Sequence, residues 1–353
     1  MDRKLVIGMV SAHACIRILK YAIALRAEGH TVILLTSDRE THGHFNYDFI
    51  VRYNNGDQFI SALRSLNSTV DLWHVHNEPD TLVPVVRQTC PESTTIYDIH
   101  DPNHLRGELY ASQDEINSME MADAYIHVSN KCLELTNIKF PNTKPSTVIH
   151  SYVNRMFMIE SSRLPQEPCW NSIVYEGGLM SEPPQKASSG EVTVNLRYLP
   201  AIFASLISQK FHVHIHPAAD QNYTVYFGVG AFVSPATTYP NMLAALRPHG
   251  FGLVGAAYKS PLMDAAMPNK LFEYMSQGVI PIVYNADTVA RYVTENRCGY
   301  AIDDIRDVRS KLTDYKQTRK NVLDLRHTTF FETQIQKIVD FYNQVLETTK
   351  KEV

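Results

Sequence analysis

The residues best suited to chemistry lie in one short stretch, residues 267–283, which reads MPNKLFEYMSQGVIPIV. The pattern predicts an amphipathic helix that starts with Pro268 at its first position, ends at a glycine and runs into a buried strand. Asn269 and Lys270 lie near the helix N-terminus, where free N–H groups favour an anion such as a phosphate. Glu273 is one turn further on, beside Lys270 on the helix surface, and suits a sugar hydroxyl. The same spacing also fits a solvated helix with a Lys–Glu pair, so the stretch needs support from the rest of the chain.

A second group of polar side chains follows predicted strands in the first half of the chain. Its members are His13, His76, Asn77, Glu78, His100 and Asp101. The carboxyl ends of parallel strands are where ligands bind in open α/β sheets. A histidine at a strand end, such as His100, can stabilise charge or transfer a proton. It could equally have only a structural role, with its ring nitrogen hydrogen-bonded to an adjacent aspartate. His74 and His76 alternate along a strand, but this spacing with no third ligand is a weak indication of a metal, and no metal site is predicted.

Strands and helices alternate throughout both halves. The predicted strands include residues 4–10, 31–36, 71–76, 94–99, 172–175, 211–216, 224–227, 251–255 and 279–284. This alternation predicts an α/β fold with two Rossmann-like, doubly wound domains that face a cleft. The predicted boundaries are a first domain at 1–155, a proline-bearing linker at 156–171, a second domain at 172–325 and a C-terminal helical segment at 326–353 that crosses back to the first domain.

Composition narrows the class of protein. The chain has 353 residues, 44% hydrophobic and 20% charged, as ordinary globular proteins do. The net charge of -4 gives no indication of a nucleic-acid-binding surface, although it leaves a local basic patch open. Its five cysteines include no Cys-x-x-Cys, so the sequence suggests neither a zinc site nor a disulfide framework, and a reduced, cytoplasmic setting fits best. The start of the chain reads as a strand, and no apolar window reaches the ~20 residues of a membrane span.

The stretch PNKLFEYMSQGVIPIV resembles the donor-binding block of retaining glycosyltransferases of the GT-B fold, nearest to family GT4. Segments similar to those of that family occur in the same order: MADAYIHVSN, VIHSYVN, HGFGLVGAAY and VARYVTENRCGYAID. The resemblance covers most of the chain and is specific in residues 268–283. It implies that residues 1–155 form the acceptor-side domain and residues 172–325 the nucleotide-sugar donor domain.

The resemblance also implies roles for individual donor-side residues. Glu273 would bind the ribose hydroxyls, and Lys270 with Asn269 would lie near the diphosphate, with Leu271 beside them in the same block. The family often has a further glutamate where this chain has Ala265, so the adjacent Asp264 is the candidate for contacting the donor sugar.

The loop after the first donor-domain strand departs from the family pattern. Where the family often has an arginine and a lysine, this chain has the pair Gly177-Gly178. Glycines permit a phosphate to approach the backbone closely. Arg197, predicted at the start of the next helix, is the candidate for a further phosphate contact.

The activity implied is transfer of a sugar from a nucleotide-diphosphate donor of UDP or GDP type to a hydroxyl, with retention and with neither a metal nor another cofactor. His100, His13 and Asp101 are the candidate catalytic residues, and His76, Asn77 and Glu78 the candidate acceptor contacts. The acceptor would be a glycan, a lipid-linked sugar or a small molecule. A hydroxylated DNA base is an alternative that the negative charge disfavours.

The chain is also compatible with peripheral contact with a membrane, and the sequence predicts no oligomeric state. Two other functions stay open. One is a sugar-nucleotide epimerase of similar architecture, and the other is a non-catalytic subunit that binds nucleotide sugars or glycans.

Overall fold

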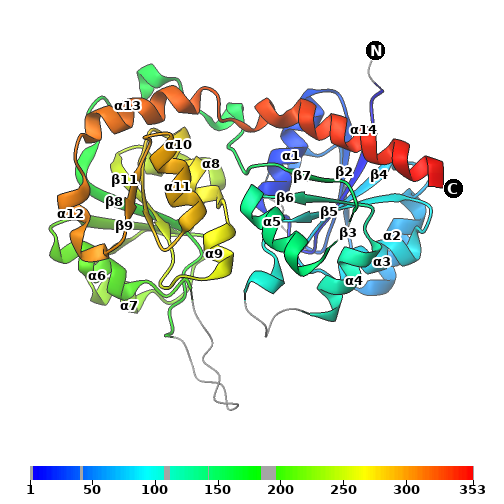
Figure 1. Cartoon of the computed structure of the whole chain (residues 1–353), viewed down its shortest axis with the longest axis horizontal. Helices are drawn as coiled ribbons and strands as arrows, with labels where there is room; N and C mark the ends of the chain where they lie inside the picture. The colour runs from blue at the N-terminus through cyan, green and yellow to red at the C-terminus, as the bar shows by residue number, and fades with distance from the viewer. Residues whose placement is uncertain (1–2, 40–42, 107–111, 142, 184–195, 353) are drawn as a thin grey trace. The chain divides into compact units, whose positions relative to one another are not determined.

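The computed structural model describes residues 3–39, 43–106, 112–141, 143–183 and 196–352. The chain forms two compact units (Figure 1). Unit 1 comprises Met1–Asn154 and Phe331–Val353, and unit 2 comprises Arg155–Phe330. Residues 156–171, predicted as a linker, therefore belong to unit 2, where two short turns of 3-10 helix precede the first strand.

Unit 1 contains a seven-stranded sheet in the order β3-β2-β1-β4-β5-β6-β7, and all of its neighbouring strands are parallel. The strands are β1 (Val6–Val10), β2 (Thr31–Thr36), β3 (Phe49–Arg52), β4 (Leu72–His76), β5 (Thr94–Ile99), β6 (Ala124–His127) and β7 (Ser146–Val148). The helices are α1 (Ile16–Ala27), α2 (Gly56–Leu66), α3 (Leu82–Thr89), α4 (Gln113–Met121), α5 (Asn130–Lys139) and α14 (Ile335–Glu352).

Helix α14 follows unit 2 in the sequence but belongs to unit 1 (Figure 1, red). The hydroxyl of Tyr342 on this helix lies 2.7 Å from Nδ1 of His74 on strand β4. Both side chains are fully buried, so this bond ties the end of the chain to the centre of the first sheet.

Unit 2 contains a six-stranded parallel sheet in the order β10-β9-β8-β11-β12-β13. The strands are β8 (Cys169–Gly177), β9 (His212–Pro217), β10 (Phe232–Val233), β11 (His249–Gly255), β12 (Ile280–Tyr284) and β13 (Tyr300–Ile302). The helices are α6 (Pro200–Ser208), α7 (Thr224–Gly228), α8 (Tyr239–Leu246), α9 (Pro261–Ala265), α10 (Asn269–Ser276), α11 (Asp287–Glu295), α12 (Val308–Lys311) and α13 (Tyr315–Arg326).

One predicted strand of unit 2 is wrong. Residues 224–227 alternate in a way that favours a strand, but they form helix α7. The side-chain oxygen of Asn222 accepts hydrogen bonds from the backbone N–H (3.0 Å) and the hydroxyl (2.6 Å) of Thr224. A side-chain acceptor at this position satisfies a backbone N–H that the helix start leaves unpaired, and so favours the helix over a strand.

Helix α10 is fixed to the sheet of unit 2 by Tyr274. Its hydroxyl accepts a hydrogen bond from the Glu176 N–H on β8 (3.0 Å) and donates one to the Leu253 carbonyl on β11 (3.3 Å). Gly252 makes room for the ring, because a Cβ there would lie 2.5 Å from a ring carbon of Tyr274. The helix with the sequence-predicted chemistry is therefore anchored where strands β8 and β11 end.

Candidate functional site

Two cationic side chains, Lys270 and Arg197, lie against the successive glycines Gly177 and Gly178 at the end of strand β8. Gly177 has a φ of 105°, a left-handed conformation that favours glycine. A Cβ at Gly177 would lie 3.5 Å from Nζ of Lys270, and a Cβ at Gly178 would lie 3.0 Å from Nη1 of Arg197. Partly exposed glycine backbone between a lysine and an arginine is an arrangement suited to a phosphate.

Lys270 is held in this position by the protein itself. Its ammonium group donates a hydrogen bond to the Glu176 carbonyl (2.9 Å) and lies 3.8 Å from the centre of the Tyr175 ring. The helix begins at Asn269, with Pro268 as the residue before it, so the predicted start is one residue early. Lys270 thus occupies the first turn of α10, as the sequence predicts, but it reaches back to strand β8.

Glu273 is 2% exposed, which rules out the solvated Lys–Glu pair. It lies near Tyr239 at the start of helix α8. Burial, followed by the negative charges of Glu273 and Glu176, raises the pKa of Tyr239 well above its ordinary value, so the hydroxyl stays protonated. Sequence reasoning did not find Tyr239 or Glu176, because no spacing relates them to Glu273.

The other predicted donor-side residues differ in their surroundings. Leu271 is fully buried in the core, so its side chain offers no surface to a ligand. Arg197 is exposed and precedes α6, which begins at Pro200 and not at residue 196 as predicted. Asp264 lies on α9, where burial and the charge of Asp287 raise its pKa.

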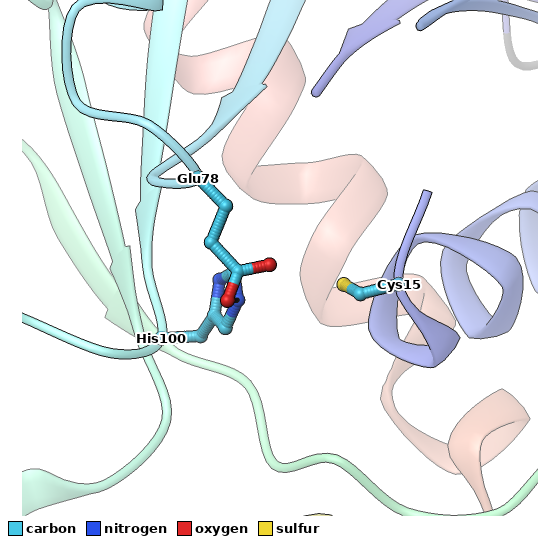
Figure 2. A group of neighbouring side chains, drawn as sticks. All are labelled: Cys15, Glu78 and His100. Atoms are coloured by element: carbon cyan, nitrogen blue, oxygen red, sulfur yellow. Dashed lines mark ion pairs between the residues drawn. The ribbon is translucent and has the colours of Figure 1, made fainter. Parts of the chain in front are cut away.

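In unit 1, His100 follows the last residue of strand β5 and lies between two carboxylates. Its Nε2 lies 3.6 Å from Oε1 of Glu78 (Figure 2). Its Nδ1 lies 3.7 Å from Oδ1 of Asp98. Burial alone would lower the pKa of His100, but the interactions with Asp98, Cys15 and Glu78 raise it well above its ordinary value. The imidazole is therefore positively charged at neutral pH.

Asp98 is the buried anion behind His100. The Arg17 guanidinium binds both of its carboxylate oxygens at 3.0 Å, and His74 Nε2 lies 3.3 Å away. Burial would raise the pKa of Asp98, but the charge of Arg17 and then the interactions with His100 and His74 hold this pKa well below its usual range. Sequence reasoning missed Arg17, which lies 81 residues from Asp98 in the chain.

Two of the predicted acceptor contacts, His76 and Asn77, are buried and contact other parts of unit 1. His76 is fully buried and stacks on His74 with ring centres 4.6 Å apart, so it cannot touch an acceptor. Asn77 is 5% exposed; its amide donates to the Asp101 carbonyl (2.8 Å) and accepts from the His100 N–H (3.4 Å). It joins the loops after β4 and β5, and so positions His100.

The remaining candidates of unit 1 are paired with other side chains. His13 is exposed and lies 3.0 Å from Asp38, and Asp101 pairs with Arg106. The side chain of Glu78 is partly exposed. Burial would raise the pKa of Glu78, but its contact with His100 outweighs this effect and lowers the pKa. Glu78 and His100 thus form an ion pair, and Asn77 joins them through its hydrogen bond with the His100 backbone.

Comparisons with known proteins bear on the fold. The sequence matches no protein-family model and no curated protein at a significant level. The structure is similar to sucrose-phosphate synthase from Thermosynechococcus elongatus (TM-score 0.69, 13% identity, 98% of this chain and 100% of that one). It is also similar to an α-glucosyltransferase solved with UDP and DNA (TM-score 0.68, 11% identity, 97% and 100%) and to HepE from Anabaena solved with UDP and glucose (TM-score 0.68, 11% identity, 95% and 98%).

The chain has the GT-B fold. The prediction of two Rossmann-like units with parallel sheets is confirmed. Within this GT-B fold, unit 2 carries the lysine, arginine and double-glycine cluster, and unit 1 carries the charged histidine. None of the helices in the described part of the chain is both long and apolar enough to cross a membrane.

Proposed function

We propose that this protein is a glycosyltransferase that uses a nucleotide-diphosphate sugar. The observation that carries the proposal is the placement of Lys270 and Arg197 over Gly177 and Gly178, with the buried Glu273 one turn along the same helix as Lys270. Two cations beside partly exposed glycine backbone suit a diphosphate, and a carboxylate suits ribose hydroxyls. The similar proteins solved with UDP support a UDP-type donor, and GDP is the alternative from sequence.

The proposed chemistry needs positive charge where the nucleotide leaves. Departure of a nucleoside diphosphate produces an anion, and fixed cations stabilise it without reorganisation during the reaction. Lys270 is held by the Glu176 carbonyl and the Tyr175 ring, so it is preorganised for this role. We propose that these residues act without a metal at the diphosphate.

On the acceptor side we assign the catalytic role to His100, with retention at the sugar as the resemblance implies. Its elevated pKa makes it an imidazolium at neutral pH. A charged imidazole can donate a hydrogen bond to an oxygen of the donor sugar or of the acceptor, while the proton of the acceptor hydroxyl leaves with the nucleoside diphosphate. The acceptor we propose is a molecule with a hydroxyl group, and the contact residue of unit 1 is Glu78.

The test is turnover with UDP-, GDP-, ADP- and CMP-linked sugars against glycans, lipid-linked sugars, small hydroxylated molecules and hydroxymethylated DNA. We expect release of one nucleoside diphosphate together with a glycosylated product, unaffected by a chelator. Lys270→Met should remove this activity, and Lys316→Met, an exposed lysine of unit 2, should retain it. Conversion of the donor sugar without nucleotide release would instead identify an epimerase, and tight donor binding without turnover would identify a binding subunit.

A further inference from the structure

Three side chains from separate loops of unit 1 meet beyond the ends of its strands: Cys15, Glu78 and His100 (Figure 2). The thiol sulfur, a carboxylate oxygen and an imidazole nitrogen all lie within 4.8 Å of one another. We propose that this cluster is a binding site for a thiophilic divalent cation, for which zinc is the best match. Thiolate, imidazole and carboxylate are the three protein ligands that zinc takes.

The imidazole and the carboxylate already have the spacing of two metal ligands. His100 Nε2 lies 3.6 Å from Glu78 Oε1. Two ligands about 2.1 Å from a tetrahedral zinc ion are about 3.4 Å apart. The gap is longer than a hydrogen bond and matches the spacing of two tetrahedral ligands, so a metal ion would replace the ion pair of the two groups and release the Nε2 proton of His100.

The thiol of Cys15 is available to complete the set. Cys15 is the N-cap residue of helix α1, a position where Ser, Thr, Asp or Asn normally supplies a side-chain acceptor. Its side chain makes no capping hydrogen bond. In Figure 2 the sulfur points toward the Glu78 carboxylate. Two ligands of a tetrahedral ion lie about 3.4 Å apart, so separations of up to 4.8 Å require the side chains to draw together around the ion.

The surroundings of His100 resemble the second layer of a metal site. A histidine that binds a metal usually donates its other ring N–H to a carboxylate, which fixes the ring. The Nδ1 of His100 faces Asp98 at 3.7 Å and has no hydrogen-bond partner among the described residues. Asp98 is itself held by Arg17. The ring is therefore already oriented with Nε2 toward Glu78.

The neighbouring group His74, His76 and Asp98 is a weaker candidate. Its His74 is bonded to Tyr342 and its Asp98 to Arg17, a buried cation that would repel a metal ion. By contrast, the Glu78 side chain is 37% exposed, which gives an ion a route to the Cys15 cluster. The cluster supplies three ligands and leaves a fourth position for water. This site rests on unit 1 geometry and not on the proposed transferase activity.

Cobalt(II) is the probe that tests the proposal, because a cobalt–thiolate bond absorbs in the near ultraviolet. We expect the metal-free full chain to bind one equivalent of cobalt with this charge-transfer band and with strong visible bands of a tetrahedral ion, and zinc to displace it. Cys15→Ser should remove the charge-transfer band. His100→Gln and Glu78→Gln should each weaken binding by at least about tenfold, which is ~1.4 kcal/mol.

Cys169→Ser is the matched control, because Cys169 is an exposed cysteine of unit 2 and its loss should leave the spectrum unchanged. Circular dichroism of each variant establishes that it is folded. A wild-type chain without the charge-transfer band, or a band that persists in folded Cys15→Ser, would overturn the proposal.

Discussion

The ammonium group of Lys270 donates a hydrogen bond to the backbone carbonyl of Glu176 at 2.9 Å, across 94 residues of sequence. This bond joins the first turn of helix α10 to the last residues of strand β8. It places a positive charge beside a glycine that has a left-handed conformation. The donor site proposed for unit 2 depends on this relationship.

Gly177→Ala should therefore damage both stability and donor binding. A non-glycine residue at a φ of 105° costs of order 1–3 kcal/mol, and the added methyl group would lie 3.5 Å from Lys270 Nζ. Urea unfolding and donor titration measure the two effects. Gly228→Ala is the control, since it lies in helix α7 with nothing within 4 Å of the new Cβ, and it should leave both quantities intact. Equal behaviour of the two variants would contradict the role given to Gly177.

The buried pair of Arg17 and Asp98 predicts a large stability effect in unit 1. Arg17→Met leaves the Asp98 carboxylate buried without its main counter-charge, and breaking such a pair costs about 3–5 kcal/mol. Chemical denaturation of the variant measures the loss. Arg306→Met removes an exposed arginine paired with Asp304 and should leave the unfolding midpoint unchanged. A loss below ~1 kcal/mol in Arg17→Met would show that Asp98 is solvated or protonated.

Acid should weaken both units through buried histidines. Burial lowers the pKa of His127 in unit 1 and of His249 in unit 2 from 6.5 to about 4. The unfolded chain then binds more protons than the folded one, so stability is full above pH 6.5 and falls as the pH drops toward 4. Each histidine should cost about 2 kcal/mol between neutral pH and pH 5.

Denaturant unfolding at both pH values tests this dependence. His127→Gln and His249→Gln each remove one titrating group, and each should flatten the loss of stability on acidification. An undiminished slope in both variants would assign the acid sensitivity to other residues.

Zinc should inhibit transfer if the metal site and the role of His100 are both correct, because the ion would occupy the imidazole nitrogen that the reaction needs. Activity assays with added zinc should show inhibition of the wild-type chain and little of Cys15→Ser, which keeps His100 and Glu78. Equal inhibition of the two proteins would show that the ion acts elsewhere.

The sequence predicts the fold well because strand–helix alternation and buried strands are local patterns. It also predicts that Asn269, Lys270 and Glu273 lie on one short helix, since their spacing decides it. It suggests Arg197 as a phosphate contact but cannot predict that Arg197 lies over Gly178. The residues between the two show no helix or strand periodicity that would fix their distance. The sequence places Glu78 and His100 in one group of strand-end residues, but it does not find Cys15, because the distances among three loops that follow three different strands are set only by the fold.

The burial of individual side chains also could not be predicted from the sequence. Leu271 belongs to the block that carries the family resemblance, and His76 ends a strand, but both side chains are fully buried. Helix α7 shows the same limit at the level of secondary structure, because a hydrogen bond to the side chain of Asn222, one residue before the N-cap, favours it. Such outcomes depend on long-range packing or on one side-chain hydrogen bond, neither of which periodicity records.

Calorimetric titration with UDP-glucose and GDP-linked sugars tests the central claim most directly. Lys270→Met and Glu273→Gln should each weaken binding of the preferred nucleotide sugar by at least about tenfold, since charged hydrogen bonds contribute ~1.5–3 kcal/mol. The exposed-residue variants Lys316→Met and Glu295→Gln should bind as the wild type does. Wild-type affinity in folded Lys270→Met and Glu273→Gln would contradict the donor site proposed for unit 2.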